Sequence, residues 1–396
     1  MSVVPGLEVL LGEKTGEFAG ARAGLCCNHT AVDRRLRHAA ELLPEAGFDL
    51  VRLFGPEHGT RAAVQMMEGV DEQPDAVTGL PTVSLYGDSE ESLHPAPETL
   101  EDLDTVFFDI QDIGARYYTY QATLGYLMEV AGRTGTRVVV LDRPNPLGGT
   151  ATEGPLVHPG YQSFVGAFPL AVRHGMTAGE LALYFTRHCG VECEVEVIPC
   201  RGWRRDSWFD QTGLPWVYPS PNIPTLETAA VYPGMCLFEA TNVSEGRGTT
   251  RPFHLAGAPW LDPRGLAGRC AEGARGAGLE GVAFRPASFI PTFEKHAGHL
   301  CGGVEVHVLE RDKLTPFLLG MVVLEAVYQT DPENFGWRTE PYEFVSDPPA
   351  IDLLTGSSLF RQTLLDGRPV HELPAEWKRE LEAFRERRRE CLLYRQ

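Results

Sequence analysis

The feature that most constrains the fold is an alternation of short apolar runs with helical patterns over the first 145 residues. The runs have the length of strands and are rich in Val, Ile, Leu and Phe. They are Arg22–Asn28, Asp49–Phe54, Thr82–Tyr86, Thr105–Ile110 and Arg137–Leu141. Helical patterns lie at Leu36–Leu43 and from Tyr118 to Thr134. Such an alternation is typical of a buried parallel sheet built from βαβ units, so it predicts an α/β fold.

Polar side chains follow these strands at the points where they end. In open α/β sheets, ligands bind at the carboxyl ends of the strands, and we therefore expect the polar residues to converge on one edge. They are Asn28, Glu57, His58, Asp109, Gln111, Asp112, Asp142 and Asn145. Asp and Asn are also common in turns and helix caps, which is a second explanation for each residue taken alone.

The rest of the chain is less regular and indicates a second domain. Thr177 and Glu180 form a capping-box pattern before a helix that reaches His188. A Pro- and Trp-rich stretch, Gly202–Pro233, is long enough to be functional and is the most plausible place for a domain change. Further elements are expected at Glu194–Ile198, Pro263–Ala274, Val282–Pro286, Gly303–Leu309, Pro316–Gln329 and Ala375–Tyr394. We predict a Rossmann-like α/β domain over 1–230 and a smaller α+β domain over 231–396.

Composition excludes several classes of partner. The chain has 35 basic and 54 acidic residues, a formal net charge of −19. Phosphate contacts need a positive field, so the chain is a poor candidate for binding nucleic acid or an anionic membrane. The longest apolar stretch, Phe317 to Tyr328, is shorter than the roughly 20 residues that span a bilayer. The N-terminus has no basic leader with an apolar run, and the nine cysteines are irregularly spaced. We therefore expect a cytoplasmic protein with reduced thiols.

No motif predicts a cofactor. Gly276–Gly281 matches GxGxxG, but it precedes its strand, whereas a dinucleotide fingerprint follows one. The sequence contains no Walker lysine motif, no GxSxG and no HExxH. His296, His299 and Cys301 lie close in sequence, but three such residues in a loop are more often incidental than a metal site. We expect neither a metal nor a nucleotide.

Three segments are dense in polar and turn residues: Phe54–Arg61, Asp109–Tyr120 and Phe238–Thr250. Together they offer carboxylates, arginines, tyrosines and an asparagine, a combination that suits carbohydrate chemistry. Glycoside hydrolysis needs a carboxylic acid beside the leaving oxygen and a second group that attacks or activates water. The alternative is that these acids form ion pairs with Arg61, Arg116 and Arg247.

The same segments carry a resemblance to a known family. The blocks are FGPEHGTRA, FFDIQDIGARYYTYQATL, LDRPNPLGG, YPSPNIPT and FEATNVSEGRGTTRPFHLAGAPW. In this order they resemble the bacterial NamZ-type exo-β-N-acetylmuramidases, long filed as a domain of unknown function. The resemblance implies a Rossmann-like domain, a smaller C-terminal domain and an active site in the cleft between them. It implies release of terminal N-acetylmuramic acid from the non-reducing ends of peptidoglycan fragments.

The resemblance also suggests roles for individual residues. The family's proposed catalytic glutamate corresponds to Glu57, and we take Glu245 as the candidate second catalytic group. Candidate substrate-binding residues are Asn28, His58, Arg61, Asp109, Gln111, Asp112, Arg116, Tyr118, Tyr120, Asn145, Glu239, Asn242 and Arg247. N-acetylmuramic acid carries a lactyl carboxylate, which an arginine can bind in a bidentate manner. Arg116 and Arg247 are the best placed in the blocks, followed by Arg61 and Arg143.

Two other functions fit the same residues. One is a protein that binds muropeptides without turnover. The other is a hydrolase of this fold that acts on another glycoside or on an ester, because a fold does not determine its substrate. In each case the expected partner is a small sugar or muropeptide.

Overall fold

The computed structural model of the chain describes residues 2–61 and 73–395. The chain divides into two compact units. Unit 1 comprises Met1–Ala151, His174–Pro221 and Arg385–Gln396, and unit 2 comprises Thr152–Arg173 and Asn222–Phe384. Each unit therefore takes segments from more than one part of the chain. The predicted boundary after residue 230, which follows chain order, stays a prediction.

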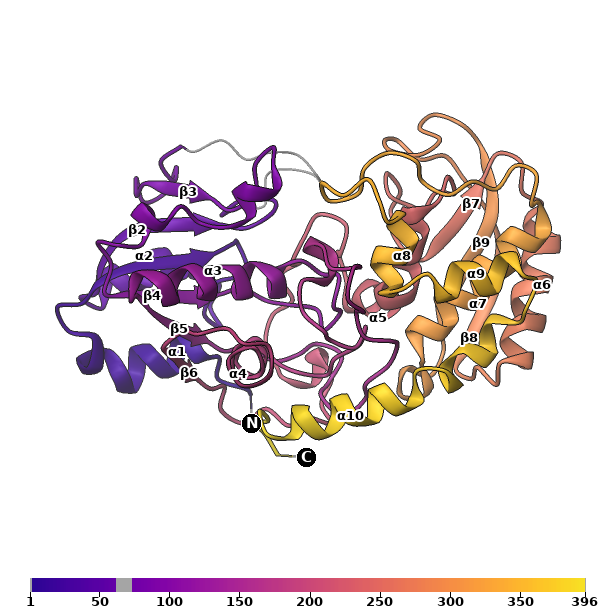
Figure 1. Ribbon diagram of the computed structural model, residues 1–396. Helices are drawn as coiled ribbons and strands as arrows, with labels where there is room; N and C mark the ends of the chain where they lie inside the picture. The colour runs from indigo at the N-terminus through magenta and orange to yellow at the C-terminus, as the bar shows by residue number, and fades with distance from the viewer. Residues whose placement is uncertain (1, 62–72, 396) are drawn as a thin grey trace. The chain divides into compact units, whose positions relative to one another are not determined.

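Unit 1 is built on a six-stranded parallel sheet with the order β3-β2-β1-β4-β5-β6 (Figure 1). The strands are β1 Arg22–Cys27, β2 Asp49–Gly55, β3 Thr82–Ser84, β4 Thr105–Asp109, β5 Arg137–Leu141 and β6 Val195–Ile198. Leu25 of β1 pairs with Leu53 of β2 and with Phe107 of β4. The order reverses between β1 and β4, and ligands of doubly wound sheets bind outside the carboxyl ends at such a reversal.

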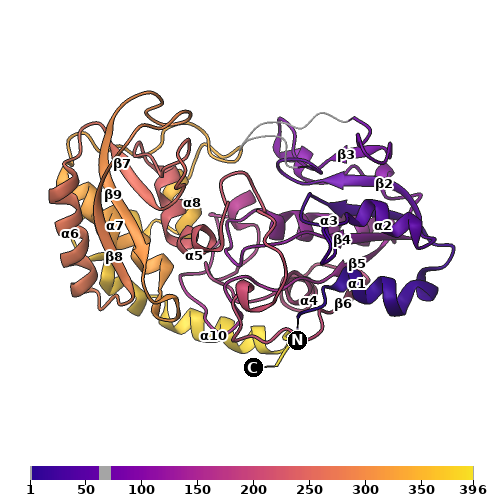
Figure 2. The ribbon, with the colours of Figure 1, turned by 180° about the vertical axis from the view of Figure 1, so that it is seen from behind.

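Alternate side chains of a strand point to opposite sides of the sheet. Both faces of this sheet are apolar, and helices cover each of them. On one face, a hydrophobic cluster joins Leu25 and Phe107 of the sheet to Leu7 of α1 (Gly6–Val9) and Leu43 of α2 (Ala39–Glu45). Helices α3 (Tyr120–Thr134) and α4 (Ala178–His188) contact each other and β5 (Figures 1 and 2). The capping box of Thr177 and Glu180 at the start of α4 is confirmed.

Two predicted helix boundaries are wrong for local reasons. Helix α2 begins at Ala39 and not at Leu36, because Leu36 has a φ of 65°, which an α-helix excludes. His38 is the N-cap residue, and its ring accepts a hydrogen bond from the Ala40 N–H. At the other end of the chain, α10 covers only Lys378–Arg389, and a 3₁₀ segment precedes it at Val370–Ala375.

Unit 2 contains a three-stranded antiparallel sheet with the order β7-β9-β8 (Figure 2). The strands are β7 Leu255–Ala258, β8 Val282–Phe289 and β9 Cys301–Val308. The helices are α5 Leu226–Met235, α6 Pro263–Gly276, α7 Pro316–Thr330, α8 Ala350–Thr355 and α9 Leu359–Leu365. Helix α6 packs on β8, β9 and α7, while α5 packs on α7. A parallel-sheet domain with a second, smaller α+β domain is thus confirmed. Among the described residues, no helix is long and apolar enough to cross a bilayer.

Candidate active site

A tight turn directs Glu57 away from the end of β2. The Gly59 N–H donates to the Pro56 carbonyl at 2.8 Å, which places Glu57 and His58 at the two central positions of the turn. His58 has a φ of 70°. A positive φ at the third turn position usually calls for glycine, and non-glycine residues in this conformation cluster at functional sites. The turn therefore gives Glu57 a fixed direction through a conformation that is unfavourable for histidine.

The carboxylate of Glu57 is held by Thr119. The Thr119 hydroxyl donates to Glu57 Oε2 at 2.7 Å, and Glu57 is only 6% exposed. Thr119 is the N-cap residue of α3. Threonine commonly caps a helix from this position, but here its hydroxyl serves Glu57 instead. Thr119 was not among the residues predicted from the sequence, although it lies between Tyr118 and Tyr120 in a matched block.

Two tyrosines flank Thr119 and lie close to two carboxylates. The rings of Tyr118 and Tyr120 pack edge to face, with 5.0 Å between their centroids. Burial raises the pKa of both phenols, and the nearby charges of Glu57 and Asp112 raise it further. Both hydroxyls therefore keep their protons at neutral pH, and that of Tyr120 donates to the Pro219 carbonyl at 2.7 Å.

Asp112 has one occupied and one unoccupied carboxylate oxygen. Its Oδ2 accepts a hydrogen bond from the Gly114 N–H at 2.7 Å and lies 3.5 Å from His174 Nε2. Its Oδ1 is buried and has no hydrogen-bond partner among residues 2–61 and 73–395. Asp112 itself is 9% exposed. An unpaired buried acceptor is costly, so this oxygen is suited to accept a hydrogen bond from a ligand.

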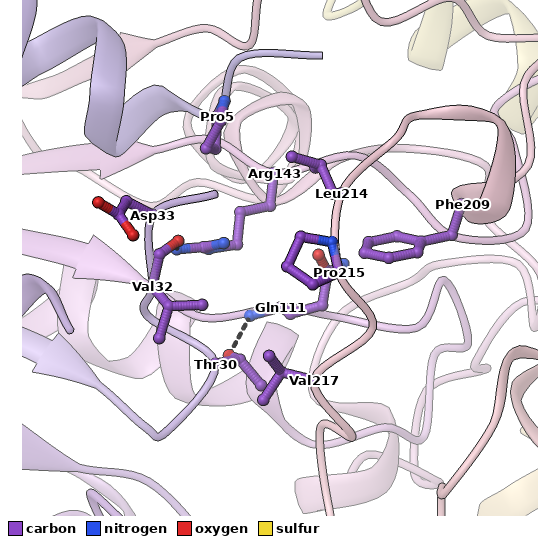
Figure 3. Close-up of a pocket in the computed structure, with 10 residues that line it drawn as sticks. All are labelled: Pro5, Thr30, Val32, Asp33, Gln111, Arg143, Phe209, Leu214, Pro215 and Val217. Carbon is purple, nitrogen blue, oxygen red and sulfur yellow. Dashed lines mark hydrogen bonds between the residues drawn. The ribbon is translucent and has the colours of Figure 1, made fainter. Parts of the chain in front are cut away.

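The ends of β1 and β4 are joined by a chain of hydrogen bonds. Asn28 Oδ1 accepts from the N–H of Thr30 at 3.0 Å and from its hydroxyl, and the Thr30 hydroxyl accepts from the Gln111 N–H at 2.9 Å (Figure 3). The side chain of Asn28 also lies within hydrogen-bonding reach of the Tyr120 hydroxyl. Beside this link is a pocket lined by Pro5, Thr30, Val32, Asp33, Gln111, Arg143, Phe209, Leu214, Pro215 and Val217.

Gln111 and Asn145 bind the loops that surround the site. Gln111 Nε2 donates to the carbonyls of Asp112 at 2.7 Å and Pro144 at 2.9 Å. Asn145 Nδ2 donates to the Met176 carbonyl at 2.9 Å. In these contacts both side-chain amides bind backbone carbonyls of neighbouring loops.

The four candidate arginines, Arg61, Arg116, Arg143 and Arg247, differ in accessibility. Arg143 binds both oxygens of the fully buried Asp109, with 3.0 Å between Nη2 and Oδ2. Arg116 is 0% exposed and Arg247 is 6% exposed. Arg61 binds Asp75 with two hydrogen bonds of 2.7 and 2.8 Å, and 30% of its side chain is exposed. Arg61 is therefore the most accessible of the four.

A second charged cluster lies in unit 2. Lys295 Nζ donates to Glu245 Oε2 at 2.9 Å and to the Phe238 carbonyl at 2.7 Å. Arg247 Nη2 donates to Glu239 Oε1 at 2.8 Å, and its Nε lies 3.8 Å from Glu245 Oε1. Burial opposes ionisation of Glu245, but the charges of Lys295 and Arg247 hold its pKa below the usual value. Glu245 is therefore an ion-paired carboxylate.

Other predicted residues of unit 2 bind the loops around this cluster. Asn242 Nδ2 donates to the Asn334 carbonyl at 2.9 Å, and the ring of His296 contacts the Asn242 carbonyl at 2.7 Å. His299 contacts the Ala297 carbonyl at 2.9 Å. Within the described part of the chain, no three His, Cys, Asp or Glu side chains gather as metal ligands would.

Comparison with known families decides the relationship. The profile for the N-terminal domain of exo-β-N-acetylmuramidase NamZ matches residues 23–227, and that for its C-terminal domain matches residues 230–394. The chain belongs to the NamZ family. It is 41% identical over 393 residues to the peptidoglycan β-N-acetylmuramidase NamZ of Bacillus subtilis. The aligned region covers 99% of this chain and 91% of that protein.

Solved structures agree with the NamZ assignment at the level of the fold. A crystal structure of a DUF1343 family protein from Bacteroides fragilis has a TM-score of 0.88 and 33% identity, and covers 100% of this chain and 99% of that chain. A second protein of the same family and organism has a TM-score of 0.77 and 29% identity with the same coverage.

The predicted site residues fall into two groups. Those of unit 1 lie at the ends of the parallel strands or on the segments that follow them: Asn28, Glu57, His58, Arg61, Asp109, Gln111, Asp112, Arg116, Tyr118, Tyr120 and Asn145. Those of unit 2 are Glu239, Asn242, Glu245 and Arg247. Thr119, His174 and Lys295 also contact these residues and were not predicted from the sequence. Their roles in binding and catalysis stay predictions.

Proposed function

We propose that the chain is a glycoside hydrolase that releases terminal N-acetylmuramic acid from the non-reducing ends of peptidoglycan fragments. Membership of the NamZ family over nearly the whole chain supports this activity. The observation that carries it is the arrangement at Glu57, a buried carboxyl group held by Thr119 beside two protonated tyrosines. Glycosidic cleavage needs such a directed carboxyl group.

In this proposal Glu57 is the acid/base group. As an acid it gives its proton to the glycosidic oxygen while the bond to the anomeric carbon breaks. The Thr119 hydroxyl donates to Oε2 and so leaves Oε1 to face the leaving group. Tyr118, Tyr120 and Asn28 supply hydroxyl and amide groups for hydrogen bonds to the sugar.

The identity of the second catalytic group is part of the proposal. Glu245, the candidate from the sequence, is paired with Lys295 and Arg247. Ion pairing on both oxygens favours a structural role for Glu245, whereas Asp112, near the tyrosines, has an oxygen with no partner in the described part of the chain. We therefore favour Asp112. Asp112→Asn should lose far more turnover than Glu245→Gln, and the reverse result would restore Glu245 as the second group.

An arginine is proposed to read the lactyl carboxylate of the substrate. The carboxylates of Glu57 and Asp112 repel an anion, so a positive group is needed nearby. Arg116 and Arg247 were the first choices from the sequence, but both are buried. The exposed fraction of Arg61 makes it the stronger candidate.

Hydrolysis of a chromogenic N-acetylmuramic acid glycoside by the purified protein tests the function. The proposal expects turnover that scales with enzyme and is lost in Glu57→Gln. A protein that only binds muropeptides would show thermal stabilisation by the sugar without turnover. Turnover of other glycosides or of esters, with none of the muramic substrate, would support the third function.

We place this activity in the cytosol. All nine cysteines lie among the described residues, and none of them forms a disulfide there. This thiol state fits a reducing compartment, and the proposed substrate is then a peptidoglycan fragment that has entered the cell. Fractionation of cells expressing the native gene, with activity assayed in each fraction, tests the location.

A further inference from the structure

We infer that His174 is a positioning residue of the active site, which fixes the carboxylate of Asp112 so that Oδ1 faces the bound sugar. The inference rests on the proposed function and adds a residue to it. His174 lies in the segment that leads to α4, outside the blocks that carried the family resemblance.

The contacts of His174 determine which ring nitrogen carries the proton. His174 is 0% exposed, and its Nδ1 accepts a hydrogen bond from the Met176 N–H at 3.1 Å. A neutral imidazole that accepts at one nitrogen donates at the other, so the proton lies on Nε2. That nitrogen is 3.5 Å from Asp112 Oδ2 and has no closer acceptor among the described residues.

The loop that carries His174 is held from two sides. The Met176 carbonyl accepts from Asn145 Nδ2 at 2.9 Å. The Gly175 carbonyl accepts from Arg205, which is 3% exposed and also binds Glu180. These buried contacts hold the backbone next to His174, and the Met176 N–H that binds Nδ1 belongs to the same loop.

Asp112 is fixed just as closely on the side of Oδ2. Gly114, which donates to this oxygen, has a φ of 83°, and an added Cβ would lie 2.5 Å from Asn145 Oδ1. Oδ2 accepts from the Gly114 N–H and faces His174 Nε2 at 3.5 Å, so Oδ1 is the oxygen that has no partner among the described residues and is left for a ligand. A terminal amino sugar offers hydroxyl and amide N–H groups that satisfy such an acceptor.

Asp112 and Glu57 lie near the same pair of tyrosines. The charges of both carboxylates act on the phenols of Tyr118 and Tyr120. A hydrogen bond from the sugar to Asp112 Oδ1 would therefore form within the site that holds Glu57. His174 has no direct part in this bond and acts through Asp112.

A double-mutant cycle on the full-length enzyme tests the coupling. Asp112→Asn should lower kcat/KM about 100-fold or more, and His174→Leu about 10-fold, mainly through kcat. His174→Gln keeps an N–H donor and should recover part of the loss. The double variant Asp112→Asn/His174→Leu should be no slower than Asp112→Asn alone, because His174 acts through the carboxylate.

The inference would be overturned if the losses of Asp112→Asn and His174→Leu multiplied in the double variant. It would also be overturned if His174→Leu changed only KM. His254→Leu is the matched control, because His254 is also buried (1% exposed) but lies in unit 2 and contacts the Val306 carbonyl. Its effect should multiply with that of Asp112→Asn. Melting temperatures of all variants separate loss of folding from loss of turnover.

A second readout does not depend on activity. ¹⁵N chemical shifts of the His174 ring should show the Nε2–H tautomer, and Asp112→Asn should shift the Nε2 resonance while Glu245→Gln leaves it unchanged. A proton on Nδ1, or a resonance insensitive to Asp112→Asn, would contradict the inference even if the enzyme is active. Absence of turnover by the wild type, with the expected ring shifts, would instead contradict the proposed function.

Discussion

Thr119 Oγ1 donates to Glu57 Oε2 at 2.7 Å. This bond connects the turn after β2 to the N-cap residue of α3, two segments that are distant in sequence. It holds one oxygen of the Glu57 carboxyl group, Oε2. The geometry of the proposed acid/base group therefore depends on a helix-cap residue whose hydroxyl is turned toward the site.

Thr119→Val should lower kcat about 10- to 100-fold with little change in KM. The variant removes a hydrogen bond to a charged group, which is worth about 1.5–3 kcal/mol. Thr119→Ser keeps the hydroxyl and should retain most of the activity. Steady-state kinetics on a muramic glycoside, with melting curves for both variants, make the measurement. Equal kcat values for Thr119→Val and Thr119→Ser would show that the hydrogen bond from residue 119 to Glu57 is irrelevant to catalysis.

The accessible arginine should control selectivity for muramic over glucosamine glycosides. Arg61→Ala should reduce the ratio of the two kcat/KM values about 10- to 100-fold, because a charge-assisted hydrogen bond to the lactyl carboxylate is lost. Arg61→Lys should restore only part of the lost selectivity, since lysine cannot bind a carboxylate in a bidentate manner. The same ratio in Arg116→Ala and Arg247→Ala gives the comparison. A change in either of these, with none in Arg61→Ala, would assign the lactyl group to a buried arginine.

The stability of unit 2 should fall as pH rises through the titration of Glu153. Burial raises the pKa of Glu153 to about 7, although backbone N–H groups of Leu318 and Phe317 at the start of α7 oppose this. The folded state then binds more protons than the unfolded state between pH 4.5 and 7. The stabilisation is fully present below pH 4.5 and is lost as pH rises through about 7.

Glu153→Gln should remove this dependence. A shift of this size corresponds to about 3 kcal/mol at most. Urea unfolding from pH 4 to pH 8 should show the wild type losing stability relative to the variant over that range. A constant difference between the two proteins at every pH would contradict the raised pKa.

The crossing of α5 and α7 should tolerate no side chain at its centre. A Cβ added at Gly320 would lie 2.1 Å from the Gly234 carbonyl oxygen, which is backbone and cannot move aside. Gly320→Ala should cost roughly 1–3 kcal/mol or more. Gly268→Ala in α6 is the control. The described structure leaves open space there, so that variant should gain about 0.5–1 kcal/mol. Similar unfolding free energies for the two variants would refute the close helix contact.

Local patterns in the sequence predicted most of the sheet and its helices. The β-branched runs identified five of the parallel strands because buried strands have no polar face. The capping box at Thr177 was predictable because both partners lie within one turn of helix. The start of α2 was not, since the left-handed conformation of Leu36 has no signature in a non-glycine residue.

The site was less predictable, because its decisive contacts join distant segments. Lys295 lies 50 residues from Glu245 and belongs to a loop with no recognisable motif. His174 meets Asp112 only when the loop before α4 folds onto the end of β4. Neither pair leaves a local pattern. The sequence therefore offered Arg247 as an ion-pair partner for the acids of this segment but did not indicate Lys295, which also binds Glu245.

Glu57 should drive the release of N-acetylmuramic acid. The most direct measurement is the amount of free N-acetylmuramic acid liberated from peptidoglycan fragments with that sugar at the non-reducing end, by wild type and by Glu57→Gln at equal concentration. Glutamine has nearly the same shape as glutamate but cannot act as an acid or a base. Binding of the fragment should therefore persist, and release should fall about 10²- to 10⁴-fold. Release by Glu57→Gln at a rate close to that of the wild type would contradict the account.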